Sequence, residues 1–149
     1  MTKPHFPIIT IYKDFPEISL SERELESVNL LAVLKVKNVM AFDKEGVKWS
    51  YDLRSNQVKD NLWTRLAANT FYNPMVQAQL IWTKVDLYTL AELRETLKEC
   101  VNKDDDLLTQ FMEPSELKSE IDKAQNFQDL CSALEKAEVD PVDYGELKE

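Results

Sequence analysis

The amino-terminal half of the chain alternates between apolar and polar residues with the period of a β-strand. In residues 47–54 the apolar face consists of Val47, Trp49, Tyr51 and Leu53. A strand with one apolar and one polar face is typical of an antiparallel sheet. Residues 43–46 precede it and end in Gly46, where a hairpin loop needs a positive φ. The pattern therefore predicts a hairpin between strands at 39–42 and 47–54.

Three further segments are predicted to be strands. Residues 7–12 are rich in β-branched side chains and lie next to prolines, and residues 30–36 form an apolar run. Residues 75–88 predict a longer strand, but their apolar positions change face near residues 82–84. This change of phase indicates a β-bulge or burial on both sides.

Two helices are expected among these strands. A short one would begin at a capping box, formed either by Ser19 with Glu22 or by Ser21 with Glu24. The other would cover residues 58–71 and end before the proline at position 74.

Beyond residue 88 the apolar period lengthens to about 3.6, which predicts helices. Thr89 can cap the first, whose apolar stripe is Leu90, Leu93, Leu97 and Val101. A second is expected over residues 114–124, and a third after Asn126. Strands followed by helices predict an α+β fold: an antiparallel sheet mainly from the amino-terminal half, with the carboxyl-terminal helices packed on one face.

Length and composition fit a single α+β domain over residues 1–149, with a core at about 7–138 and an irregular tail at 139–149. The chain has only two glycines, which excludes glycine-rich phosphate loops and dinucleotide fingerprints. We expect no signal peptide and no membrane span, and hence a cytoplasmic protein. Cys100 and Cys131 are then expected to be buried free thiols, with a disulfide as the alternative.

Negative charge is concentrated after residue 75. Residues 1–75 carry ten Lys or Arg against nine Asp or Glu, and residues 76–149 carry eight against eighteen. Such a surface repels nucleic acids and anionic lipids and attracts basic proteins. The alternative is that these acidic residues only keep the helices soluble.

The side chains that support catalysis or cofactor binding are sparse. His5 is the only histidine, with no identifiable partner for nucleophilic catalysis, and one histidine with two distant cysteines lacks zinc-ligand spacing. We therefore expect no enzyme activity, no cofactor and no metal. An acid–base hydrolase remains an alternative that requires a pocket with two carboxylates of different pKa. Trp49, Trp63 and Trp82 are predicted in the core, with a stacking platform as the alternative.

Residues 104–106 are three consecutive aspartates, the most concentrated acidic feature of the chain. One of them could cap the turn that follows, where negative charge is favourable. Alternatively, they could bind a basic partner. A metal site is the third possibility, although adjacent helical residues point in different directions and no EF-hand pattern surrounds them.

The carboxyl-terminal half, from residues 88–93 through 104–111 to 127–130, resembles the immunity proteins of bacterial toxin systems, including contact-dependent inhibition. The resemblance implies a cognate inhibitor that binds a basic toxin, often a nuclease, by charge complementarity. In that hypothesis six carboxylates replace phosphates at the toxin's active site: Asp104, Asp105, Asp106, Glu113, Glu116 and Glu120.

The alternative function is a non-catalytic accessory or regulatory subunit of a phage or mobile-element system that binds through an apolar surface. Trp63, Phe71 and Tyr72 distinguish the two hypotheses. If these side chains form an exposed patch, the alternative is favoured, because large apolar patches mark interaction sites.

Overall fold

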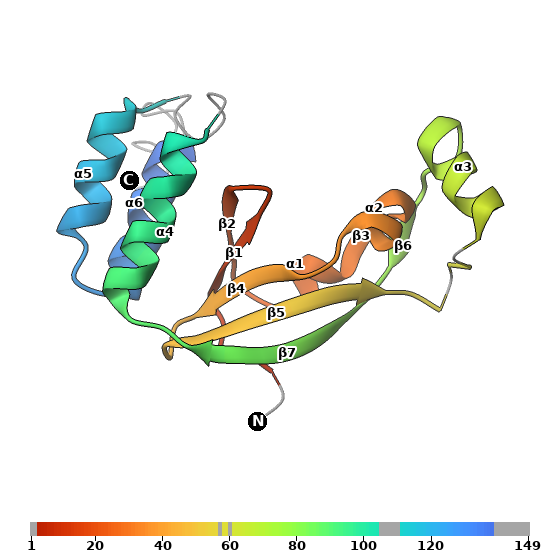
Figure 1. Cartoon of the computed structure of the whole chain (residues 1–149), viewed down its shortest axis with the longest axis horizontal. Coiled ribbons are helices and arrows are strands. Elements are labelled where there is room, and N and C mark those ends of the chain that lie inside the picture. The colour runs from red at the N-terminus through yellow and green to blue at the C-terminus, as the bar shows by residue number, and fades with distance from the viewer. Residues whose placement is uncertain (1–2, 57, 60, 105–110, 139–149) are drawn as a thin grey trace, which may run out of the picture.

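A computed structural model describes residues 3–56, 58–59, 61–104 and 111–138 (Figure 1). Its main sheet is antiparallel and has the order β2-β1-β4-β5-β7. The strands of this sheet are β1 (Ile8–Tyr12), β2 (Phe15–Ser19), β4 (Val39–Asp43), β5 (Val47–Arg54) and β7 (Gln79–Leu87). A separate antiparallel pair consists of β3 (Ser27–Asn29) and β6 (Met75–Gln77). The helices are α1 (Arg23–Glu26), α2 (Leu30–Lys35), α3 (Leu62–Thr70), α4 (Leu90–Asn102), α5 (Pro114–Lys123) and α6 (Phe127–Glu138).

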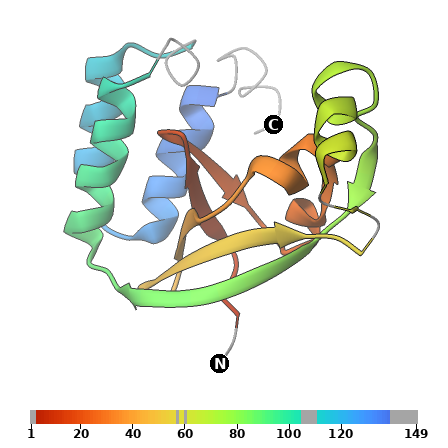
Figure 2. The same ribbon diagram turned by 45° about the vertical axis from the view of Figure 1, so that its right-hand side comes forward.

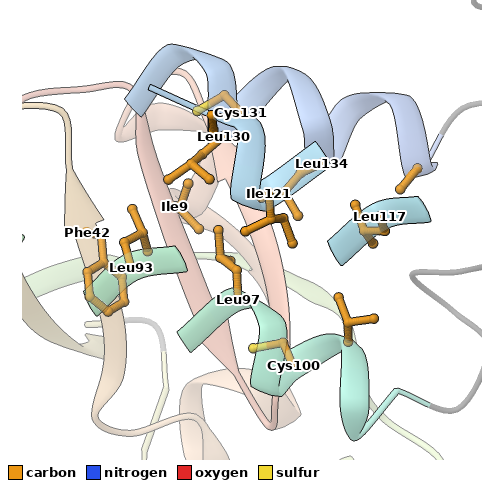
Figure 3. Packing of buried hydrophobic residues seen from close by; sticks show 13 residues of the cluster. Ile9, Phe42, Leu93, Leu97, Cys100, Leu117, Ile121, Leu130, Cys131 and Leu134 are labelled. Atoms are coloured by element: carbon orange, nitrogen blue, oxygen red, sulfur yellow. The ribbon is translucent and has the colours of Figure 1, made fainter. Parts of the chain in front are cut away.

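The carboxyl-terminal helices cover one face of the sheet, as the sequence predicts: α4 and α6 pack on its strands, and α5 packs on α4 and α6. In Figure 3, Ile9 of β1 and Phe42 of β4 lie close to Leu93 and Leu97 of α4. Leu130 of α6 belongs to the same buried cluster. Burying large aliphatic side chains between sheet and helices supplies the main favourable free energy for holding these layers together.

The opposite face of the sheet packs against α1, α2 and the β3–β6 pair. Tyr51 and Leu53 of β5 point to this side and meet Val33 of α2 and Leu80 of β7. The sheet is therefore covered on both faces, by elements from different halves of the chain.

The predicted caps of two carboxyl-terminal helices are confirmed. The Thr89 hydroxyl accepts a hydrogen bond from the Glu92 amide at the start of α4, at 3.2 Å. At the start of α6 the Asn126 side chain accepts one from the Asp129 amide, at 2.8 Å. Each cap satisfies an amide that the first helical turn leaves without a backbone partner.

The predicted β4–β5 hairpin is also confirmed, and Asp43 organises it. This carboxylate is fully buried and accepts hydrogen bonds from the amides of Glu45 and Val47 and from the Trp49 indole, each at 2.9 Å. The His5 amide donates a fourth, at 3.2 Å. Gly46 has φ +85°. A Cβ there would lie 3.7 Å from the Tyr88 carbonyl oxygen, an ordinary contact distance, so the backbone conformation and not a lack of space is the reason for glycine.

The segment at residues 30–36 is a helix, α2, and the predicted strand is wrong. The Asn29 side chain caps it by accepting from the Ala32 amide, at 2.8 Å. Its buried residues Leu30, Val33 and Leu34 follow helical spacing. A short apolar run fits either a strand or a helix, and here the cap and the good helix formers leucine and alanine favour the helix.

Strand β2 was not predicted, because its hairpin with β1 lacks the usual glycine signal. Lys13 and Asp14 form the turn with φ of +50° and +63°. Pro16 lies in β2, where the edge of the sheet tolerates a proline. The predicted capping box is also wrong: Glu22 is the N-cap residue of α1 and makes no side-chain capping hydrogen bond.

The predicted long strand at residues 75–88 is divided in two. β6 pairs with β3, and β7 pairs with β5 in the main sheet. A bulge was predicted near residues 82–84, and the structure has one at the next residue, Val85. Lys48 pairs with Asp86 and Trp49 with Lys84, so Val85 is the extra residue of β7.

Both cysteines are buried free thiols, as predicted. Burial is the main cause that raises the pKa of Cys100 to about 11, followed by the charge of Asp14. Burial, and then Glu135, raises the pKa of Cys131 to about 12.

We predict that Asp43→Asn destabilises the protein by about 3 kcal/mol, because an amide retains one acceptor oxygen and turns an NH₂ group toward buried donors. Urea unfolding measures the loss. Glu45→Gln is the matched control, since its side chain is exposed in the same turn, and should change stability little. Equal losses in the two variants would contradict the role of Asp43.

We also predict that stability falls as pH rises above about 9. Above pH 9 the unfolded chain releases the thiol protons of Cys100 and Cys131, whereas the folded protein keeps them. The free energy of unfolding therefore falls as the pH rises from about 9 toward the folded pKa values of about 11 and 12. The slope is at most about 1.4 kcal/mol per pH unit for each thiol. Urea unfolding at pH 8 to 10 tests this, and replacing both cysteines with alanine should flatten the profile.

Candidate functional site

The helix α3 lies at the opposite end of the molecule from α4, α5 and α6 in both views (Figures 1 and 2). It begins where the Asn61 side chain accepts a hydrogen bond from the Thr64 amide, at 2.9 Å. It ends where the amides of Phe71 and Tyr72 both donate to the Ala67 carbonyl, at 2.9 and 2.8 Å. Both ends of this short helix are thus fixed by hydrogen bonds to the chain itself.

α3 packs on the protein through its small side chains. Ala68 is its only buried residue and joins a cluster with Leu30 and Leu34 of α2. Successive residues of a helix are about 100° apart around its axis. The side of α3 opposite to Ala68 therefore carries Leu62, Trp63 and Leu66, all within roughly 100° of arc. The larger apolar side chains of the helix therefore point away from the body of the protein.

This arrangement leaves a large apolar surface in contact with solvent. Among its aromatic members, Trp63 is 75% exposed, Phe71 79% and Tyr72 58%. We call the whole set the α3 apolar surface; its exposed members are Leu62, Trp63, Leu66, Phe71, Tyr72 and Met75. The three aromatic side chains alone expose on the order of 400 Å². Such an area is comparable with the largest apolar patch on a typical monomer, about 300–600 Å².

The α3 apolar surface is hollowed beside the helix. A groove of about 420 Å³ is bordered by Trp63 and Tyr72, with Leu30, Thr64 and Ala67 along it and Lys59 at its side. Grooves flanked by aromatic side chains accept the apolar anchors of a partner.

The segment around α3 is held to the protein by polar contacts as well. The Leu31 amide donates to the Asn73 side chain, and the Leu30 amide to the Pro74 carbonyl, each at 2.8 Å. The Lys35 ammonium donates to the Asn69 side chain at 3.0 Å. These bonds connect both ends of α2 to the helix α3 and to the turn that follows it. The apolar surface thus has a fixed base.

The structure corrects the prediction for Trp63, which was expected in the core with Trp49 and Trp82. Trp49 is buried, and Trp82 packs against it edge-on, with ring centroids 6.3 Å apart. Trp63 is exposed because Ala68, on the opposite side of α3, faces the protein. The sequence predicted a buried Trp63 because the pattern of apolar residues along a helix is the same whether that side faces the core or a partner protein.

The acidic residues predicted to bind a partner are brought together only in part. Asp105 and Asp106 lie outside the described residues. Asp104 follows α4 and is half-buried, and its amide donates to the Val101 carbonyl at 3.3 Å. It lies after the end of α4, whereas the other three predicted carboxylates lie at the start of α5 or within it.

Glu116 and Glu120 lie four residues apart on the same side of α5, and Glu113 is the N-cap residue directly before this helix. Glu113 and Glu116 are exposed. Glu120 is half-buried and lies 3.9 Å from the ammonium of Lys136 on α6. The structure therefore brings two of the six predicted carboxylates to one side of α5 and places a third at the start of this helix.

Other acidic residues of these helices are engaged within the protein. Lys98 of α4 bridges Glu95, at 2.8 Å, and Asp122 of α5, at 2.9 Å. Hydrogen bonds to Glu95 and then to Asp122 raise the pKa of Lys98. Two of the carboxylates on this part of the helical surface are therefore already paired with a lysine of the protein itself.

Within the described part of the chain, no three His, Cys, Asp or Glu side chains gather where they could share a metal ion. His5 is exposed and contributes its backbone amide to Asp43. The described helices include none with the length and apolar character that crossing a membrane requires. No family model, curated protein or solved structure matches this chain.

We predict that Trp63→Ala changes the free energy of unfolding by no more than about 0.5 kcal/mol, because the side chain is mostly in solvent. Trp49→Ala is the matched control and should cost about 3–5 kcal/mol, since it empties a buried site. Urea unfolding compares the two. Similar losses would show that Trp63 is packed in the core.

Proposed function

We propose that this protein is a non-catalytic protein-binding module, an accessory or regulatory subunit, that engages its partner through the α3 apolar surface. The observation that supports the proposal is the exposure of Trp63, Phe71 and Tyr72 on one short, anchored helix and its following turn. Trp and Tyr are enriched among the residues that dominate binding free energy at interfaces.

The energetics favour a partner. Burying about 400 Å² of aromatic surface is worth on the order of 10 kcal/mol before the costs of association are subtracted. Because α3 is already capped and held on α2, little additional ordering of the backbone is needed when the partner binds. The partner is expected to present apolar side chains that fill the groove between Trp63 and Tyr72.

The amino-terminal half that contains α3 is close to neutral, with ten basic and nine acidic residues in positions 1–75. Binding there should depend mainly on apolar contacts and only weakly on salt. This distinguishes the α3 apolar surface from the acidic helices at the other end of the molecule.

An immunity protein that neutralises a basic toxin is the second candidate function. Its support is the position of Glu116 and Glu120 on one side of α5, with Glu113 at the start of the helix; Glu113 and Glu116 are exposed. Opposite charges would speed association with a basic protein, and salt would slow it.

Site-specific photo-crosslinking in the host cell tests the proposal. We predict that p-benzoylphenylalanine in place of Trp63 captures a defined protein, whereas the same residue in place of Glu116 does not, because the partner lies against α3. The binding of the purified partner should weaken at least about 100-fold with Trp63→Ala, the typical size of an effect at a dominant interface residue. A crosslink from position 116 alone would contradict the proposal and favour the immunity hypothesis.

The same purified partner separates the two candidates by kinetics. For α3 binding, Glu116→Lys combined with Glu120→Lys should leave the association rate and its salt dependence unchanged. For an immunity protein, that double variant should lower the association rate and remove most of its salt dependence.

A further inference from the structure

A cavity of about 610 Å³ lies between the main sheet and the helices α1 and α2, on the face opposite to α4–α6. Its sheet wall includes Val39 and Leu53, and its helical wall includes Ala32 and Val36. Small-molecule sites typically enclose about 300–1,000 Å³ and are mostly apolar with a few polar groups. The cavity has both properties.

Two buried residues with hydroxyl groups line the cavity, Thr10 and Tyr51. The Thr10 hydroxyl donates to the Glu17 carbonyl at 3.4 Å, which leaves the Tyr51 hydroxyl as the group to consider. This side chain is only 7% exposed and lines the cavity from β5. Every fully buried side-chain polar atom among the described residues has a hydrogen-bond partner. No hydrogen bond joins the Tyr51 hydroxyl to another described residue, and the residue lines the cavity, so this hydroxyl is free to bond to a molecule bound there. A largely buried tyrosine whose hydroxyl has no hydrogen-bond partner among the described residues can bind a ligand.

The state of the Tyr51 hydroxyl defines what it can recognise. Burial, and then the charge of Glu17, raises the pKa of Tyr51 to about 12. The phenol therefore keeps its proton at neutral pH and can donate a hydrogen bond. A ligand that complements it must offer an acceptor, such as a carbonyl or an ether oxygen.

The open side of the cavity carries three exposed charged residues: Lys13, Glu17 and Glu24. Two carboxylates against one ammonium disfavour an anionic ligand. Glu24 already accepts a hydrogen bond from the Leu20 amide, at 2.8 Å, and Lys13 lies over the Tyr12 ring, 5.5 Å from its centroid. A cation would have to lose its hydration against apolar walls, which is costly.

We propose that this cavity binds a small neutral apolar molecule, such as an aromatic ketone, that accepts a hydrogen bond from the Tyr51 hydroxyl. The aliphatic walls between the sheet and α2 would enclose its apolar part. The site shares no residue with the α3 apolar surface, so it adds to the proposed protein-binding function and does not depend on it.

The test uses the neutral naphthyl ketone Prodan, whose emission shifts to the blue in apolar surroundings and to the red when its carbonyl accepts a hydrogen bond. The protein should bind one Prodan per chain with blue-shifted emission. Tyr51→Phe should weaken binding by about 2- to 10-fold and shift the bound emission further to the blue, because it removes one neutral hydrogen bond. Tyr72→Phe, the same change on the α3 apolar surface, should alter neither.

A second pair of variants fills space instead of removing a hydrogen bond. Ala32→Phe places a ring in the cavity and should lower the affinity for Prodan at least tenfold, whereas Ala91→Phe, on the exposed side of α4, should leave it unchanged. If Ala32→Phe does not fold, the emission of the Tyr51→Phe complex decides the question. The proposal would be overturned if Prodan still bound to a folded Ala32→Phe variant, or if binding were lost with Trp63→Ala. It would also be overturned if Tyr51→Phe changed neither the affinity for Prodan nor the emission of the bound dye.

Discussion

The buried carboxylate of Asp43 is the contact on which the arrangement of both layers depends. Its oxygens bind the turn between β4 and β5, the Trp49 indole and the amino-terminal segment at His5. The Asp43 carbonyl accepts from the Tyr88 hydroxyl, and the Tyr88 amide donates to the Gly46 carbonyl at 2.9 Å. Tyr88 directly precedes α4 and its cap, so this network determines where the carboxyl-terminal helices leave the sheet. Burial and the Asp43 charge raise the pKa of Tyr88, which keeps it a donor.

The two faces of the sheet are covered in different ways. The carboxyl-terminal helices meet it through fully buried side chains such as Leu93 and Leu130, which leave little space. On the other face the short helices α1 and α2 cover the strands, and the cavity beside Tyr51 remains between them and the sheet. Close packing stabilises the first layer, and the looser second layer leaves room for a ligand.

The same short helix α2 connects the cavity with the α3 apolar surface. Ala32 lies along the cavity, while Leu30 and Leu34 pack on Ala68 of α3. Because alanine is small, α3 docks closely on α2 and presents its larger side chains outward. The acidic helices lie at the far end of the molecule, so apolar and electrostatic recognition would use separate surfaces.

Local sequence determined the elements with strong periodicity and a cap, namely the β4–β5 hairpin with Gly46 and the helices after Thr89 and Asn126. Those signals act between residues only a few positions apart, and together they also predicted the α+β arrangement. Only the tertiary structure decided that α2 packs between the sheet and α3 and that Trp63 faces solvent. Both outcomes depend on which surface lies opposite each apolar stripe, and that surface comes from residues distant in sequence. The cavity at Tyr51 likewise exists only where separate elements meet, so no local pattern could reveal it.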